Sequence, residues 1–189
     1  MSLVMMMQIH IDQLIDTERW LEFEEKAENF TVLADMIKNN EYDFLAPIKS
    51  RLRAYRVSDM VAVEGNLETV VRLSCSRCLS GFETQIASGF TLTYAPEKPD
   101  SLDALPNQEV ELGPGDMGLI PFSGAEINLM EGIQEQVVMA FPLKPLCREK
   151  CKGLCPKCGA NLNAGDCGCD KANFNNKFSV LKKLNLDKT

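Results

Sequence analysis

Eight cysteines constrain this chain more than any other feature of its 189-residue sequence. The first seven residues are apolar but short, and Asp12 and Asp16 follow them, so no secretory signal is expected. Thiols in such a chain are expected to stay reduced, in the cytoplasm, and to bind metal rather than pair as disulfides. Six cysteines lie close together near the C-terminus and two form a separate pair: Cys147, Cys151, Cys155, Cys158, Cys167 and Cys169, with Cys75 and Cys78 apart.

The last four cysteines have the spacing of one metal site. The segment Cys155-Pro156-Lys157-Cys158-Gly159 predicts a tight knuckle, because glycine tolerates positive φ and leaves amide N–H groups free to bond the sulfurs. Cys167-Gly168-Cys169 supplies a second pair. We expect Cys155, Cys158, Cys167 and Cys169 to hold one zinc ion in a zinc-ribbon-like tail. Four thiolates leave no position for a catalytic water, so the expected role is structural.

The two remaining pairs add up to a second set of four possible ligands. If Cys75 and Cys78 meet Cys147 and Cys151, one zinc ion joins the tail to the strand turn that carries the first pair. The alternative is that Cys75 and Cys78 are reduced thiols without a metal. The spacing of the cysteines alone does not decide between these two alternatives.

The central part of the chain alternates between apolar and polar residues. This period of two, from Tyr42 to Tyr94, predicts a meander of three or more antiparallel strands. Turn signals stand at Ser58-Asp59, Gly65-Asn66 and Ser80-Gly81, and the last of these lies beside the Cys75/Cys78 pair.

Flanking segments add a short strand and two helices to this expectation. Residues 8–11 alternate and predict a strand, whereas residues 17–28 predict a helix with Trp20, Leu21 and Phe23 on its apolar side. A second helix is expected over residues 128–141. Asn128 is a good N-cap, Glu131 holds the capping-box position, and Pro142 ends the apolar pattern.

These elements predict an α+β fold, an antiparallel β meander packed by a C-terminal helix and followed by the small Cys-rich tail. The body spans residues 8–143 and the tail residues 144–189. The proline-rich, acidic segment near residues 96–118 is expected to be a mobile loop. The alternative is an acidic mimic of RNA that occupies a basic site.

Charge divides the chain at the same boundary. Residues 1–143 hold 10 Lys and Arg against 23 Asp and Glu, whereas residues 144–189 hold 10 against 4. A zinc ion with four thiolates carries about −2, so one such site lowers the tail's net charge from +6 to about +4.

Two basic surfaces are candidates for RNA binding, because guanidinium groups bind phosphates and an aromatic ring can stack on a base. The first lies on one face of a strand and consists of Lys49, Arg51, Arg53 and Tyr55. The second lies on the tail and consists of Arg148, Lys150, Lys152 and Lys157. A solvated face without a partner is the alternative for the strand.

The sequence offers little for catalysis. His10 is its single histidine, and no phosphate loop or nucleophile motif is present. We therefore expect no enzyme and no small-molecule substrate. No run of 18 apolar residues occurs, so no membrane partner is expected.

Several motifs resemble those of the YceD-like family of bacterial and plastid proteins. The resemblance rests on residues 145–169, on Cys75-Ser76-Arg77-Cys78-Leu79 with Phe82 after it, and on Glu126-Ile127-Asn128-Leu129 and Phe141-Pro142-Leu143. These proteins are described as large-ribosomal-RNA-subunit accumulation proteins. The resemblance implies a non-enzymatic, cytoplasmic ribosome-biogenesis factor needed for synthesis, processing or stability of 23S ribosomal RNA.

Three function classes follow. The first is a factor that binds large-subunit ribosomal RNA directly or through a ribosomal protein. The second is a zinc-containing adaptor whose acidic body binds a basic protein. The third is a thiol or metal sensor that uses the cysteine pairs.

Overall fold

The computed structural model describes residues 7–14, 17–40, 42–97 and 118–169. Most of the acidic segment expected as a mobile loop, residues 98–117, and the end of the tail, residues 170–189, lie outside the described residues. No helix in the described ranges is both long and apolar enough to cross a membrane.

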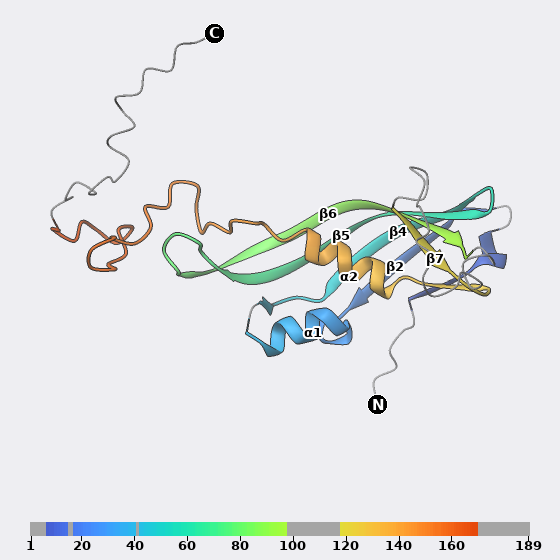
Figure 1. Cartoon of the computed structure of the whole chain (residues 1–189), viewed down its shortest axis with the longest axis horizontal. Coiled ribbons are helices and arrows are strands. Elements are labelled where there is room, and N and C mark those ends of the chain that lie inside the picture. Colours follow the sequence, from blue (N-terminus) through green and yellow to red (C-terminus); the bar gives the residue numbers. More distant parts are fainter. Residues whose placement is uncertain (1–6, 15–16, 41, 98–117, 170–189) are drawn as a thin grey trace, which may run out of the picture.

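A six-stranded sheet forms the centre of the molecule (Figure 1). Its order is β2-β4-β5-β6-β7, and β3 pairs with β5 beside the end of β4. The strands are β2 (Arg19–Glu25), β3 (Asp43–Phe44), β4 (Ile48–Val57), β5 (Met60–Ser74), β6 (Gly81–Pro96) and β7 (Leu119–Phe122). All pairs are antiparallel except β6–β7, so the predicted meander is confirmed.

The helix predicted over residues 17–28 is wrong, because the structure has β2 there. Seven residues of β2 pair with β4, from Arg19↔Ala54 to Glu25↔Ile48. Leu21 and Phe23 lie half-buried on one face, while Trp20 on the other face is 61% exposed. The two apolar residues that face the core, Leu21 and Phe23, are therefore two positions apart, as in a strand.

The turn predicted at Gly65-Asn66 is also wrong. Both residues lie inside β5, which runs without interruption for 15 residues. A Cβ at Gly65 would stand 2.4 Å from Leu52 Cδ2 and 2.9 Å from the Arg51 carbonyl oxygen. Glycine is needed here for a close approach between strands and not for a turn. The turn at Ser58-Asp59 is confirmed.

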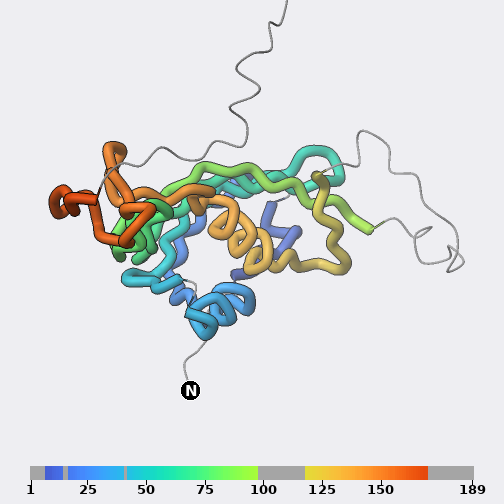
Figure 2. Tube along the Cα trace, turned by 60° about the vertical axis from the view of Figure 1, so that its left-hand side comes forward, coloured from blue at the N-terminus to red at the C-terminus, as the bar shows by residue number. Residues whose placement is uncertain are grey.

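Two helices lie on one face of the sheet, α1 (Thr31–Lys38) and α2 (Met130–Met139) (Figure 2). The predicted second helix is confirmed with shorter bounds, and Asn128 Oδ1 accepts the Met130 N–H at 2.9 Å near its start. Leu33, Leu52 and Ile133 are fully buried in the main core between helices and sheet. Smaller elements complete the body: β1 (Gln8–His10), which pairs with β8 (Glu126–Asn128), and the 3₁₀ turns η1 (Ile11–Leu14) and η2 (Ala27–Asn29).

The β5–β6 hairpin extends away from the helices and meets the tail at its tip (Figures 1 and 2). The tail has little regular structure. Its one isolated β-bridge in the described part joins Leu154 and Asn161. The expected zinc-ribbon architecture is thus not confirmed.

Candidate metal centres

The turn between β5 and β6 is a knuckle that aims two cysteine sulfurs at one point. Cys75 N–H donates to the Ser80 carbonyl at 3.0 Å, and Leu79 N–H donates to the Cys75 carbonyl at 2.9 Å. Leu79 closes the turn with φ of 59°. Cys75 and Cys78 are both buried.

The tail repeats this geometry. Cys155 N–H donates to the Ala160 carbonyl at 2.8 Å, and Gly159 N–H donates to the Cys155 carbonyl at 2.9 Å. Gly159 has φ of 75°, as its place in the sequence predicts. The two Cys-x2-Cys knuckles therefore share one backbone conformation, although leucine closes the first and glycine the second.

The cysteines form two groups of four, as the spacing suggested. The hairpin cluster is Cys75, Cys78, Cys147 and Cys151, and the tail cluster is Cys155, Cys158, Cys167 and Cys169. In each cluster all four Sγ atoms lie within 4.8 Å of one another. The open question of whether the two remaining pairs meet is thereby answered, because they lie together.

The sulfur separations in the hairpin cluster suit a tetrahedral metal. Cys75 Sγ lies 3.8 Å from Cys151 Sγ, and Cys78 Sγ lies 3.7 Å from Cys147 Sγ. Zn–S bonds of about 2.3 Å in a tetrahedron place the sulfurs about 3.8 Å apart. A disulfide needs about 2.05 Å. The donor set fits zinc, since four thiolates at this spacing are its preferred structural ligands.

Hydrogen bonding and burial give the thiols within each cluster different pKa values. The backbone N–H of Cys147, with those of Cys78 and Arg77, lowers the pKa of Cys75 to about 6. Burial and neighbouring thiols raise the pKa of Cys147 to about 12.

The tail cluster shows the same division. Backbone N–H groups of Cys158 and Lys157 lower the pKa of Cys155 to about 6, whereas the thiols of Cys158 and Cys167 raise the pKa of Cys169 to about 12. Four thiolates repel one another at such distances, so a cation between them is needed for all four to ionise.

Residues around the hairpin cluster fasten the tail to the turn. Arg77 Nη1 donates to the Cys151 carbonyl at 3.0 Å, and Ser76 N–H donates to the Pro145 carbonyl at 2.8 Å. Asn163 Nδ2 lies 3.3 Å from Cys151 Sγ and can stabilise a thiolate there. Gly153 packs on Arg77, whose carbonyl oxygen would lie 3.1 Å from a Cβ at residue 153.

Sequence reasoning missed Arg77 and Asn163 as parts of the site. Both side chains contact Cys151, which lies 74 positions from Arg77 and 12 positions from Asn163 in the sequence. Only the position of Arg77 inside the Cys75–Cys78 knuckle signalled its role.

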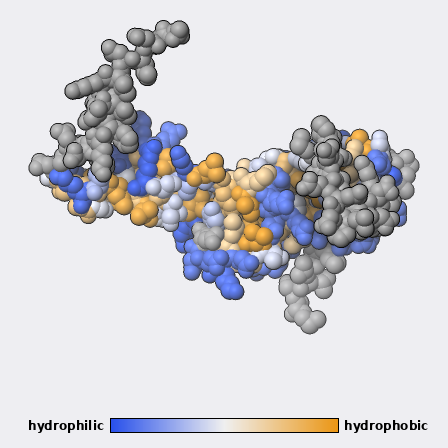
Figure 3. Space-filling view, viewed as in Figure 1, coloured by the Kyte–Doolittle hydropathy of each residue, from blue (hydrophilic) through white to orange (hydrophobic). Residues whose placement is uncertain are grey.

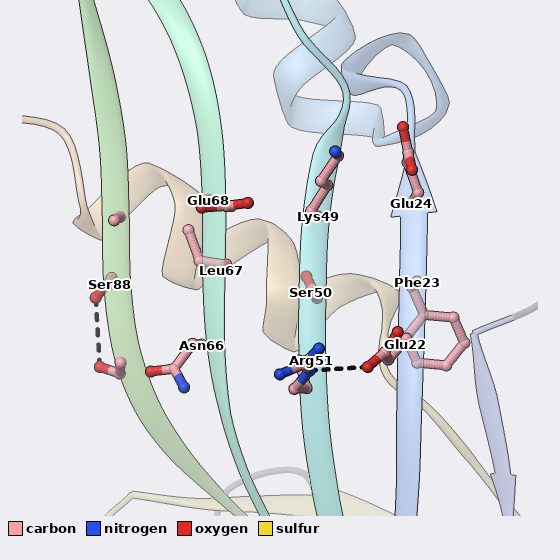
Figure 4. Close-up of a pocket in the computed structure, with 12 residues that line it drawn as sticks. Glu22, Phe23, Glu24, Lys49, Ser50, Arg51, Asn66, Leu67, Glu68 and Ser88 are labelled. Carbon is pink, nitrogen blue, oxygen red and sulfur yellow. Dashed lines mark hydrogen bonds and ion pairs between the residues drawn. The ribbon is translucent and has the colours of Figure 1, made fainter.

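The basic residues of β4 share one face of the sheet, as predicted, but they face carboxylates. Arg51 Nε lies 2.8 Å from Glu22 Oε1, and the two side chains stand on neighbouring strands (Figure 4). Arg53 Nη2 lies 2.6 Å from Glu18 Oε2. The remaining contacts of the row join Tyr55 Oη to Glu64 at 2.6 Å and Arg53 to the Tyr55 ring at 4.9 Å. Much of the positive charge of this row is already balanced.

The basic residues of the tail are placed differently. Arg148, Lys150, Lys152 and Lys157 are all exposed. None of them forms an ion pair within the ranges that the structure describes. They lie between the cysteines of the two clusters in the sequence, and their charges are available to solvent or to a partner.

A comparison with known families covers both clusters. Residues 63–185 match the model of the family described as large ribosomal RNA subunit accumulation protein YceD. The chain belongs to the YceD family. This confirms the resemblance that its cysteine motifs carried, and all eight cysteines lie inside the matched YceD region.

Two plant relatives are named large ribosomal RNA subunit accumulation protein YCED homolog 1, chloroplastic. The Arabidopsis thaliana protein is 27% identical over 161 residues, which cover 76% of this chain and 50% of the relative. The Zea mays protein is 27% identical over 146 residues, or 67% and 50% of the two chains.

Bacterial relatives are more similar over a shorter stretch. An uncharacterised protein of Mycobacterium tuberculosis is 32% identical over 111 residues, covering 59% of this chain and 49% of the relative. This YceD-family chain thus spans about half the length of these relatives. No solved structure matches it.

Proposed function

We propose that this chain is a non-enzymatic factor that supports accumulation of large-subunit ribosomal RNA, and that it binds this RNA through its zinc-stabilised tail. The observation that carries the proposal is the family match over residues 63–185, which includes the hairpin turn and the complete set of cysteines.

The proposed role of zinc is structural. A hairpin cluster with four cysteine ligands has a closed coordination sphere and fastens the tail to the tip of a long hairpin. The tail cluster then shapes the segment that carries Lys157. Bound zinc supplies folding free energy to segments that have few apolar residues of their own.

The tail is a better RNA surface than β4. Arg148, Lys150, Lys152 and Lys157 are exposed and form no ion pair with the described residues, whereas Arg51 and Arg53 face Glu22 and Glu18. Two zinc clusters together contribute about −4, so residues 144–189, counted together with the Cys75 and Cys78 thiolates that complete the hairpin cluster, carry about +2. The residues 1–143, with 23 acidic groups against 10 basic ones, repel phosphate and leave the tail as the favourable approach.

Charge reversal tests the RNA surface. Changing Lys150, Lys152 and Lys157 to Glu should weaken binding to large-subunit RNA and reduce the slope of log K against log salt by about 2 to 3. The matched control changes Lys49, Arg51 and Arg53 to Glu and should have a smaller effect. Equal effects in variants with unchanged zinc content and thermal stability would disprove this placement of the surface.

A genetic test addresses the biological role separately. Deleting the gene should lower the ratio of large-subunit to small-subunit ribosomal RNA, and the intact chain should restore it. Cys75→Ser should fail to restore the ratio, whereas Ser74→Ala should succeed. An unchanged RNA ratio in the deletion strain would refute the proposed function.

A further inference from the structure

One edge of the sheet has a long unpaired stretch. β6 pairs with β5 from Ser74↔Gly81 to Val61↔Tyr94, but β7 covers its other side only at residues 93–96. Among the residues that the structure describes, no strand pairs with that side of residues 82–91. β6 lies at the border of the sheet over this stretch (Figures 1 and 2).

The ladder identifies which backbone groups point away from β5. Leu45 N–H donates to the Val70 carbonyl, so even-numbered residues of β5 face β3 and β4, and odd-numbered ones face β6. Their partners on β6 are even-numbered, as in Thr69↔Ile86. The odd-numbered residues of β6 therefore direct both N–H and C=O outward. Glu97 N–H, which donates to the β7 residue Phe122, follows the same alternation.

Beyond Glu83, this edge lacks the charges that usually prevent strands from pairing. No charged residue occurs from Thr84 to Pro96. The opposite edge, β2, has four charged residues among seven. Edge strands are commonly protected by charged side chains, so β6 is unprotected where β2 is not.

We propose that the β6 edge pairs with the β6 edge of a second copy of this chain, antiparallel and around a two-fold axis near Ala87. In this register Glu83 lies opposite Thr91 of the second copy, and Gln85 lies opposite Gly89. No like charges meet. The five outward-facing residues on each copy form five hydrogen-bonded pairs, with about two hydrogen bonds each.

The length of the open edge fits this register. The strand begins at Gly81, and β7 begins to cover the edge at Thr93. The midpoint between these limits is Ala87, so two copies use the whole stretch without displacing β7. Ala87 and Gly89 have small side chains that leave room on the face of the sheet away from α2.

An apolar surface follows α2 on the face of the sheet that the helices cover. Ala140 and Phe141, just after α2, pack against the small buried cluster that includes Ile86 of β6. Next to them Met139 is 71% exposed and Leu143 is fully exposed. Figure 3 shows apolar surface on this side of the molecule, over α2 and toward the tail.

Charge favours a second copy over a strongly charged partner. An RNA strand or a basic peptide would gain no ion pair along residues 84–96, because the segment has no carboxylate and no cation. A largely uncharged strand whose N–H and C=O groups point outward, with no strand paired to them, instead complements its own copy.

Sedimentation equilibrium of the zinc-loaded chain over a concentration series tests the proposal. The chain should be a dimer, and Ala87→Lys should be a monomer because two lysines then face each other at the axis. Ala87→Pro should also be a monomer, since proline removes one outward N–H that an edge strand can lose without unfolding. Val32→Lys, on the exposed side of α1, adds the same charge elsewhere and should remain a dimer.

Hydrogen exchange locates the interface. Amides of Gln85, Ala87 and Gly89 should be protected in the dimer and should exchange faster as dilution dissociates it. A chain that is monomeric at every concentration, or a dimer unaffected by Ala87→Lys, would overturn the proposal. Zinc content and circular dichroism establish that each variant is folded. If Ala87→Pro does not fold, Ala87→Lys alone tests the proposal.

Discussion

Leu79 occupies a backbone conformation that suits glycine better than leucine. Its φ is 59°, and its side chain is 68% exposed, so little packing compensates for the strain. Left-handed backbone costs a non-glycine residue about 1–2 kcal/mol. Gly159 holds the equivalent place in the second knuckle with φ of 75°.

Leu79→Gly should therefore raise the free energy of unfolding by about 0.5–1 kcal/mol, since the greater entropy of glycine in the unfolded chain offsets part of the gain. The matched change Gly159→Leu should lower it by about 1–2 kcal/mol. Denaturant unfolding of the zinc-loaded chains measures both. Stabilisation by Gly159→Leu would contradict the shared knuckle geometry.

The hairpin cluster predicts a stoichiometry. Elemental analysis should find about two zinc ions per intact chain and about one after Cys75→Ser, because three cysteine ligands hold zinc more weakly than four. Ser74→Ala, one residue away, should retain about two. Two ions in Cys75→Ser would rule out a shared site.

Cysteine spacing alone predicted the tail cluster. It also suggested the hairpin cluster, but only as one of two possibilities, because no local pattern brings residues 75 and 151 together. The contacts of Arg77 and Asn163 were beyond prediction for the same reason: each depends on how the tail folds against the hairpin.

At the scale of single elements, Gly65 marks a point where β5 packs closely against β4. Gly65→Ala would force its methyl group against Leu52 and the Arg51 carbonyl oxygen. We expect a loss of about 1–3 kcal/mol in the free energy of unfolding. Gly81→Ala is the control, because a Cβ there meets nothing closer than 3.9 Å, and its effect should be small. Thermal unfolding that does not separate these variants would refute close packing at Gly65.

The same glycine explains a wrong prediction. Gly-Asn is a strong turn signal in sequence, yet here the need for space beside Leu52 determines the residue. The β2 segment misled for a related reason. Trp20, Leu21 and Phe23 fit one side of a short helix, and only pairing with β4 shows that Trp20 faces away from the other two. A period of two that continues over many residues, as in β4 to β6, predicts strands without such ambiguity.

At the scale of the whole molecule, the fold has a part that should not need metal and a part that should. The main core includes Leu52, Val63 and Ile133 but no cysteine. The hairpin tip and tail are instead held by a small cluster of cysteines with Phe82, Leu146 and Leu154.

Chelation of zinc under reducing conditions should therefore speed amide exchange in residues 145–169 and at the hairpin turn, while Val63 and Leu67 of β5 remain protected. Added zinc should restore the protection. Cooperative loss of protection throughout the sheet would show that the core depends on the metal.

The hairpin cluster also imposes an order in time on a chain that is being synthesised. Its first knuckle is complete at Cys78, but Cys147 and Cys151 are made about 70 residues later. At about 5–20 residues per second, this gap lasts roughly 4–14 s. Once β6 is complete at Pro96, Cys75 and Cys78 stand at the end of a finished hairpin without their partners for the rest of that interval. Until the tail arrives, the nascent chain carries half of the proposed site, open to any thiophilic metal or oxidant nearby, and only the arrival of Cys147 and Cys151 completes a set of four thiols that could close around one ion.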